Sequence, residues 1–213
     1  MKIYAVADIH GSRERVERIG SHTERLKPDA VVIAGDITGH GDHDSLFQRL
    51  NDLPCPVLVV RGNMDSPEVD ALLERHDNIL SLHQREAIVK GIRFVGMGGT
   101  IPIPFNSKLC LREKRLIEET DRLITERSVL VAHPPPYGTL DEGFGNFHAG
   151  SRGLRRLILD RQPRLFVCGH IHERPGWAVL GKTLVVNCSM GRSGAGAWIE
   201  METDREPAVS MLL

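Results

Sequence analysis

The chain has 213 residues, with 27 Lys and Arg, 28 Asp and Glu, and 41% hydrophobic residues, which suits one globular domain over residues 1–213. Its formal net charge of −1 lacks the basic balance of a dedicated nucleic-acid binder, so a long duplex is not an expected partner. The sequence has no run of about 18 apolar residues and no signal-peptide pattern at its start, so we expect a cytoplasmic protein that does not span a membrane.

The first third of the chain alternates between strand and helix patterns. Three apolar runs are typical of buried strands: residues 2–7, 30–34 and 56–60. Helices are predicted after them, over 12–26, around 44–53, and from Ser66-Pro67-Glu68, where Ser66 reads as an N-cap and Pro67 as the first helical residue. Strands that alternate with helices indicate a largely parallel sheet covered by helices.

The rest of the chain predicts a second sheet with some antiparallel pairing. Lys90-Gly91 separates the runs 86–90 and 92–96, which suits a two-residue hairpin. Helices are predicted over 111–124 and from the N-cap Ser151 to Pro163. Further strands are expected at 128–132, 164–169, 177–180, 183–187, 197–201 and 208–212. We therefore predict the α/β class, with two mixed sheets packed face to face and helices outside them.

Seven side chains that can bind metal ions follow the predicted strands: Asp8, His10, Asp36, Asn63, His133, His170 and His172. Ligands of open α/β sheets bind at the carboxyl ends of the strands, so these residues are expected at one edge. Asp8 and His10, and likewise His170 and His172, are two residues apart, so an extended chain would point both members of each pair to one side. A single such residue is usually a cap or a surface group. Seven N and O donors together predict two ions bridged by a shared carboxylate.

The blocks that carry these donors occur in a specific order: Asp8-x-His10, Gly35-Asp36, Gly62-Asn63-x-Asp65, His133 and Gly169-His170-x-His172. Together they resemble the signature of the calcineurin-like metallophosphoesterase superfamily over most of the chain, and more loosely its small bacterial and archaeal phosphodiesterase-like branch. The resemblance implies a four-layer αββα sandwich and the hydrolysis of phosphate esters. It also implies a first ion held by Asp8, His10, Asp36 and His172, and a second held by Asp36, Asn63, His133 and His170.

We expect two divalent transition-metal ions per chain, with Mn first and Fe, Ni or Zn as alternatives, because the donors are imidazoles and oxygens without thiolate. Two ions about 3.5 to 4 Å apart lower the pKa of a bridging water and clamp the phosphoryl oxygens. The bridging hydroxide is the expected nucleophile. Ser189 and Ser193 lie in a Gly-rich turn without a nucleophile elbow, so neither is expected to attack the substrate.

One position departs from the superfamily pattern. The third block normally reads Gly-Asn-His, with a histidine that protonates the leaving oxygen or stabilises the transition state, but this chain has Met64 there. Asp65, which would orient that histidine, is then an acceptor without its usual partner. His40, His43 and His148 are the candidates for a replacement acid, and His148 ranks first because it leads into a predicted helix N-terminus. We therefore take His148 and Asp65 as candidate catalytic residues.

The sequence thus predicts a dinuclear metal-dependent hydrolase of small phosphate esters. Met64 favours phosphodiesters, because good leaving groups need little protonation. Two alternatives stay open: a phosphomonoesterase that acts on a small metabolite, and a non-catalytic protein-binding scaffold like the retromer subunit that resembles this superfamily. The retained donors favour catalysis. Arg152, Arg155 and Arg156 are either a phosphate patch or a solvated helix face.

Overall fold

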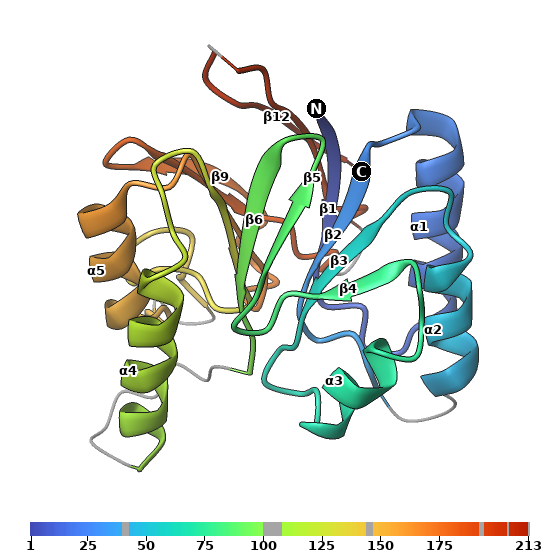
Figure 1. Ribbon diagram of the computed structural model, residues 1–213, viewed down its shortest axis with the longest axis horizontal. Coiled ribbons are helices and arrows are strands. Elements are labelled where there is room, and N and C mark those ends of the chain that lie inside the picture. Colours follow the sequence, from blue (N-terminus) through green and yellow to red (C-terminus); the bar gives the residue numbers. More distant parts are fainter. Residues whose placement is uncertain (40–42, 100–107, 144–146, 192–193, 204, 213) are drawn as a thin grey trace.

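The computed structural model describes residues 1–39, 43–99, 108–143, 147–191, 194–203 and 205–212, with side chains from residue 113 onward in the third range. Two mixed sheets pack face to face (Figure 1). The first has the strand order β12 (Ala208–Met211), β11 (Ala197–Glu200), β1 (Lys2–Val6), β2 (Ala30–Ala34), β3 (Val57–Val60) and β4 (Ile79–Ser81). The second has the order β5 (Glu86–Val89), β6 (Ile92–Met97), β7 (Val129–Ala132), β8 (Leu165–Cys168), β10 (Thr183–Asn187) and β9 (Gly176–Leu180).

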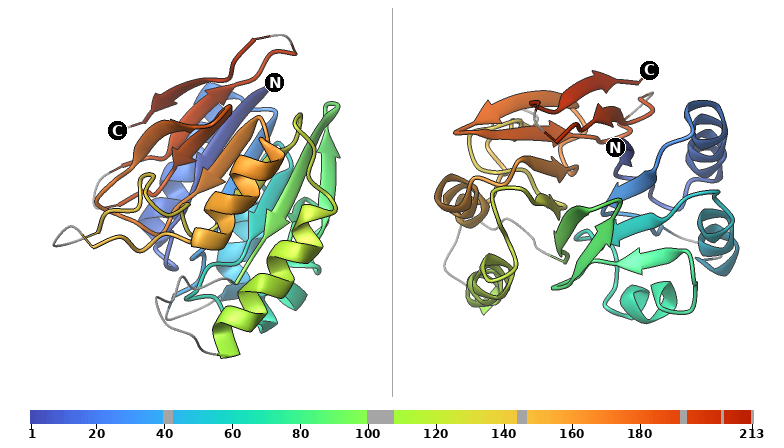
Figure 2. Two further views of the ribbon diagram at one scale, coloured as in Figure 1. Left: turned by 90° about the vertical axis from the view of Figure 1, so that its left-hand side faces the viewer. Right: turned by 45° about the horizontal axis from the view of Figure 1, so that its top comes forward.

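Helices cover the outer face of each sheet. α1 (Arg13–Leu26), α2 (His43–Asn51) and α3 (Glu68–Leu73) lie outside the first sheet, and α4 (Lys108–Asp121) and α5 (Arg152–Arg161) lie outside the second (Figure 2). This arrangement confirms the predicted αββα sandwich. Among the described helices, none has the length and apolarity needed to cross a membrane.

The buried apolar side chains form three layers, one between the sheets and one under the helices on each side. Strand β2 shows how one sequence serves two of them. Val32 and Ala34 face the second sheet, whereas Val31 and Ile33 face the helices, because successive side chains of a strand point to opposite faces. A strand buried on both faces has no polar face, and this explains the unbroken apolar run of residues 30–34.

Local signals set several of the element ends. The Ser151 hydroxyl accepts the N–H of Leu154 and caps α5, as predicted. The hairpin turn also forms as predicted, since Lys90 and Gly91 both have positive φ, 48° and 77°. The predicted cap of α3 was wrong by one position, because Pro67 occupies the N-cap and makes no side-chain cap hydrogen bond. Strand β4 was not predicted, since three residues are too short for a clear pattern.

The carboxyl ends of the parallel strands of both sheets lie on the same side of the molecule. β1, β2, β3 and β4 run parallel in the first sheet, and β6, β7, β8 and β10 run parallel in the second. A parallel bridge between Ala7 and Ser189 joins the two sheets just beyond β1 and β10. The carboxyl ends of both sets of strands therefore meet, as expected for a ligand site between α/β layers.

Candidate metal centre

The predicted metal ligands leave their strands through tight turns. Asp8, His10, Asp36 and His170 have φ values of 63°, 51°, 50° and 70°, which are uncommon for residues other than glycine. The expectation that an extended chain aligns the pairs at 8 and 10 and at 170 and 172 was therefore wrong. The Arg15 guanidinium of α1 donates to the carbonyl oxygen of Asp8 and holds the first turn. Turns kept in such conformations by their surroundings are typical of functional sites.

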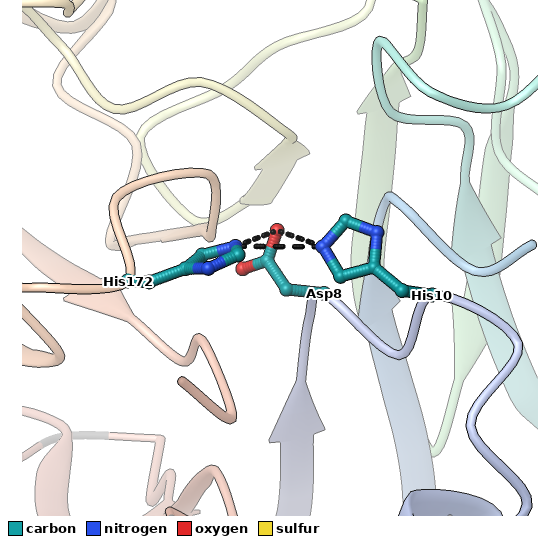
Figure 3. A group of neighbouring side chains, drawn as sticks. All are labelled: Asp8, His10 and His172. Atoms are coloured by element: carbon teal, nitrogen blue, oxygen red, sulfur yellow. Dashed lines mark hydrogen bonds and ion pairs between the residues drawn. The ribbon is translucent and has the colours of Figure 1, made fainter. Parts of the chain in front are cut away.

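The first cluster of ligand atoms consists of Asp8, His10 and His172 (Figure 3). The Nε2 atoms of His10 and His172 are 3.5 Å apart, and both point to the Asp8 carboxylate between them. Asp8 Oδ1 lies 3.3 Å from His172 Nε2 and 3.9 Å from His10 Nε2. Asp8 and His10 follow β1, and His172 follows β8. Three potential ligand atoms thus converge from two segments that lie about 160 residues apart in sequence.

The second cluster consists of Asp8, Asp36 and His133, all buried. His133 Nε2 lies 3.3 Å from Asp36 Oδ2 and 3.9 Å from Asp8 Oδ1. His133 Nδ1 is 2.8 Å from the carbonyl oxygen of Ala34, which fixes the ring with Nε2 toward the carboxylates. A histidine held in this way through its other ring nitrogen is the usual arrangement of a metal ligand.

The structure places the ring of His170 beside His133, and Met64, the residue after Asn63, donates its backbone N–H to Asp36. The rings of His133 and His170 have their centroids 5.1 Å apart, and the backbone N–H of His170 donates to Asp8 Oδ2 at 3.0 Å. Among the described residues, Asn63 Oδ1 is buried without a hydrogen-bond partner, and the buried His133 Nε2 meets only the carboxylates of Asp36 and Asp8. A buried polar atom left unpaired costs about 1–3 kcal/mol, and both atoms are of the kinds that divalent transition metals bind. The donor set therefore fits a metal site.

The charges at the edge favour cations. Burial alone would raise the pKa of Asp8, but the hydrogen bond with His172 and the charge of His133 lower it to about 2. Burial acts in the opposite sense on His133, where the contacts with Asp36 and Asp8 prevail and raise the pKa to about 8. Burial and the charge of His133 lower the pKa of His170 to about 4, so this imidazole is neutral at pH 7 and free to bind a metal.

The carboxylate shared by the two clusters is Asp8, whereas the superfamily resemblance implies that Asp36 is shared. Asp36 uses its two oxygens differently: Oδ2 faces His133, and Oδ1 accepts the backbone N–H of Met64 at 2.8 Å. Gly62 makes this approach possible, because a Cβ atom there would lie 2.0 Å from Asp36 Oδ1. The glycine before Asn63 is therefore required by the close packing of the two loops that carry Asp36 and Asn63.

Residues 1–174 match the family model described as calcineurin-like phosphoesterase. The chain belongs to this family. It is 31% identical over 200 residues to the uncharacterized protein MJ1162 of Methanocaldococcus jannaschii, covering 89% of this chain and 88% of that protein. It is 37% identical over 82 residues to the phosphodiesterase YfcE of Escherichia coli, covering 34% of this chain and 44% of YfcE. The crystal structure of TT1561 from Thermus thermophilus shares the fold, with a TM-score of 0.73, 18% identity and coverage of 99% and 98%.

Calcineurin-like phosphoesterases depend on a dinuclear metal centre, and the two clusters lie where such a centre is expected. Family membership and the phosphodiesterase-named relatives support phosphoester hydrolysis as the activity. The family resemblance implies a histidine at position 64. Here Met64 follows Asn63 directly, and its side chain is 66% exposed, so it faces solvent at the metal edge instead of packing in the core.

Asp65 has more partners than the sequence suggested. Its buried carboxylate accepts the backbone N–H groups of Ile37, Thr38 and Gly62, and also the Thr38 hydroxyl at 2.6 Å. In this calcineurin-like phosphoesterase, Asp65 thus ties the loop that carries Asp36 to the loop that carries Asn63. Its usual histidine partner is absent, as expected, and backbone donors of two loops take that place.

His148 belongs to a pair that the sequence did not reveal. Its Nδ1 lies 2.9 Å from Oδ1 of Asp141, which is buried, and its ring contacts Tyr137 with the centroids 5.3 Å apart. No motif marks Asp141, because it lies seven residues away in a loop rich in Gly and Pro. Of the other candidates, His43 is the first residue of α2, and His40 lies outside the described residues.

An ion pair connects this segment to the metal edge. Glu142 bonds to the guanidinium of Arg174, two residues after the predicted ligand His172. Glu142 and His148 lie opposite each other in an antiparallel bridge. The segment that carries His148 is therefore attached to the loop that carries His170 and His172. Sequence reasoning ranked this histidine for its place before a helix, and the structure adds the buried carboxylate behind it.

Proposed function

We propose that the protein is a dinuclear metal-dependent phosphodiesterase. The observation that carries this proposal is the pair of donor clusters that meet at Asp8, together with the buried, unpaired Oδ1 of Asn63. Asp8, His10, Asp36 and His172 would hold one ion, and Asp36, Asn63, His133 and His170 the other, with Asp8 within reach of both. Two such ions, when bound, supply a water of lowered pKa and positive charge for the phosphoryl oxygens.

The chain's own residues account for orientation and proton transfer. Asp65 is a positioning residue, because it fixes the loops that carry Asp36 and Asn63 through their backbone N–H groups. Met64 offers no proton to the leaving oxygen. We assign that role to His148, whose Nδ1 is held by the buried Asp141. A carboxylate behind the imidazole sets its tautomer and its orientation, as in other acid–base pairs.

The preference for diesters rests on Met64. A methionine at the metal edge removes one acid, so esters whose leaving group departs as a stable anion are favoured. Relatives named as phosphodiesterases are consistent with this preference. Mn²⁺ is the first metal to test, because imidazole, carboxylate and amide donors without thiolate suit Mn, Fe, Ni and Zn. The proposed enzyme uses residues 1–213 as one catalytic domain, and its cytoplasmic location stays a prediction.

The decisive assay compares bis(p-nitrophenyl) phosphate with p-nitrophenyl phosphate, using protein stripped with a chelator and reloaded with Mn²⁺. The two substrates release the same phenol, so only the state of the phosphate differs. We expect turnover of the diester to exceed that of the monoester and to fall to background in His133→Ala. The reverse preference would favour the monoesterase alternative. Absence of turnover on both with two ions bound would favour the scaffold alternative.

A further inference from the structure

A groove of about 420 Å³ opens beside the segment that carries His148. It lies along α5 and is lined by Tyr137, Arg152, Arg155, Arg156, Leu159 and Asp160. Its walls thus carry three guanidinium groups and one carboxylate. The carboxylate of Asp160 is 3.6 Å from Arg156 Nε, and both side chains are exposed, so this ion pair is weak. The groove therefore has an excess of positive charge.

Tyr137 holds two of the arginines in place. The guanidinium carbon of Arg152 lies 4.1 Å from the centroid of the Tyr137 ring, and Arg155 Nη1 donates to the Tyr137 carbonyl oxygen at 3.0 Å. Stacking on an aromatic ring and a backbone hydrogen bond both limit the freedom of these long side chains. Neither contact neutralises their charge.

Most other arginines of the described chain pair with carboxylates. Arg61 and Arg161, for example, each lie 2.6 Å from an aspartate oxygen. Within the described residues, neither Arg152 nor Arg155 has a carboxylate within ion-pair distance. Two pre-positioned guanidinium groups without an acidic partner match the oxygens of a phosphate group, which guanidinium forks bind in bidentate fashion. An ordinary solvated helix face would have neither the concave wall nor the tyrosine.

The groove adjoins the proposed proton donor. The Tyr137 ring contacts His148, and its backbone N–H donates to Ser151, the cap of α5. Tyr137 also follows the ligand His133 by four residues. A substrate whose reacting phosphate lies at the metal edge would therefore extend past His148 toward the arginines.

We propose that the groove of Tyr137, Arg152 and Arg155 binds a second phosphate group of the substrate. This inference rests on the proposed phosphodiesterase function and names its substrate class: phosphodiesters that carry a further phosphate monoester, such as a short oligonucleotide with a terminal phosphate. The groove volume exceeds that of one phosphate and leaves room for part of an attached sugar.

The kinetic test compares the dinucleotide TpT with its 5′-phosphorylated form pTpT, which differ only in the second phosphate. With Mn²⁺-loaded enzyme, kcat/KM should be about 10-fold higher for pTpT, the size of effect that one charge-assisted hydrogen bond gives. This ratio should fall toward one in Arg155→Gln and Arg152→Gln. It should fall only partly in Arg155→Lys, because lysine keeps the positive charge but lacks the paired N–H donors of the guanidinium group. The ratio should persist in Arg25→Gln, a charge-matched change in the last turn of α1. A ratio of one in the wild type would overturn the inference.

A binding experiment tests the groove independently of the proposed phosphodiesterase activity. Isothermal titration of inorganic pyrophosphate into metal-free protein, in excess chelator, reports on the groove without turnover. We expect binding that weakens about 10-fold in Arg155→Gln and Arg152→Gln and is unchanged in Arg25→Gln. If the wild type binds pyrophosphate in this way yet hydrolyses no diester, phosphate binding in the groove is supported and the phosphodiesterase proposal fails. If neither groove substitution changes the affinity for pyrophosphate, the proposal that the groove binds phosphate is refuted. Thermal denaturation of each variant checks that it remains folded.

Discussion

The substitution Asp65→Asn tests whether this carboxylate joins the two ligand-bearing loops. An asparagine of the same shape keeps one oxygen and replaces the other with an NH₂ group. If Oδ1 is replaced, the Thr38 N–H at 2.8 Å and the Thr38 hydroxyl lose their acceptor. If Oδ2 is replaced, the Gly62 N–H at 2.8 Å loses its acceptor. In both cases at least one buried backbone N–H then faces another donor.

The cost follows from these contacts. Each buried donor left unpaired costs about 1–3 kcal/mol, and the remaining hydrogen bonds also lose the strengthening that a charged acceptor gives. We therefore expect a loss of about 2–5 kcal/mol in the free energy of unfolding. This is a large part of the total, which is about 5–15 kcal/mol for an ordinary domain. With a slope of roughly 2–3 kcal/mol per molar urea, the midpoint should fall by about 1–2 M.

The assay is urea unfolding in the presence of a chelator, so that bound metal does not contribute. The control is Asp52→Asn, an equal change at an exposed carboxylate that accepts one hydrogen bond from Gln48. It should shift the midpoint by less than about 0.3 M. Asp65→Asn should also weaken metal binding, because Ile37 and Gly62 adjoin the ligands Asp36 and Asn63. An Asp65→Asn midpoint equal to that of the control would refute the loop-joining role.

Three further predictions concern the site itself. In Met64→His, the new imidazole adds a second proton donor to the one assigned to His148. The rate on an alkyl diester should therefore rise relative to that on a nitrophenyl diester, by a small part of the gain of about 10²- to 10⁴-fold that general acid catalysis gives. An unchanged ratio of the two rates would show that position 64 does not limit proton delivery, and would remove the reason for favouring diesters. Metal binding at pH 7 should release most of a proton, because the pKa of His133 is raised to about 8 in the metal-free protein, so affinity should increase as the pH rises through 8. Titration calorimetry in buffers of different ionisation enthalpy measures that proton, and heats independent of the buffer would contradict the assignment of His133. Asp36→Ala should lower turnover by orders of magnitude even at saturating Mn²⁺, whereas Asn63→Ala should chiefly weaken metal binding, and near-normal turnover of Asp36→Ala would show that the ligand assignment is wrong.

The parts of the fold that local chemistry controls were accessible from the sequence. The run of residues 30–34, the Lys90-Gly91 turn and the Ser151 cap each depend on a few neighbouring residues, and each forms as predicted. The donor clusters were accessible for a related reason, because their residues follow strands whose ends share an edge. The three-residue β4 escaped prediction, since its pairing with β3 depends on tertiary contacts.

The roles of Asp65 and Asp141 could not be read from the sequence. Asp65 bonds to backbone groups 27 and 28 residues away, and which loops meet there depends on the packing of β2 beside β3. Asp141 meets His148 through the path of one loop, and no periodic pattern encodes such a path. The choice of Asp8 as the shared carboxylate likewise depends on the turns at the strand ends and not on residue type.

The most direct test of the dinuclear site is the metal content of the loaded protein. Protein stripped with a chelator, incubated with Mn²⁺ and passed through a desalting column would be analysed for metal and protein in the same sample. The two clusters that meet at Asp8 predict close to two ions per chain. One ion per chain, or none, would contradict the dinuclear site.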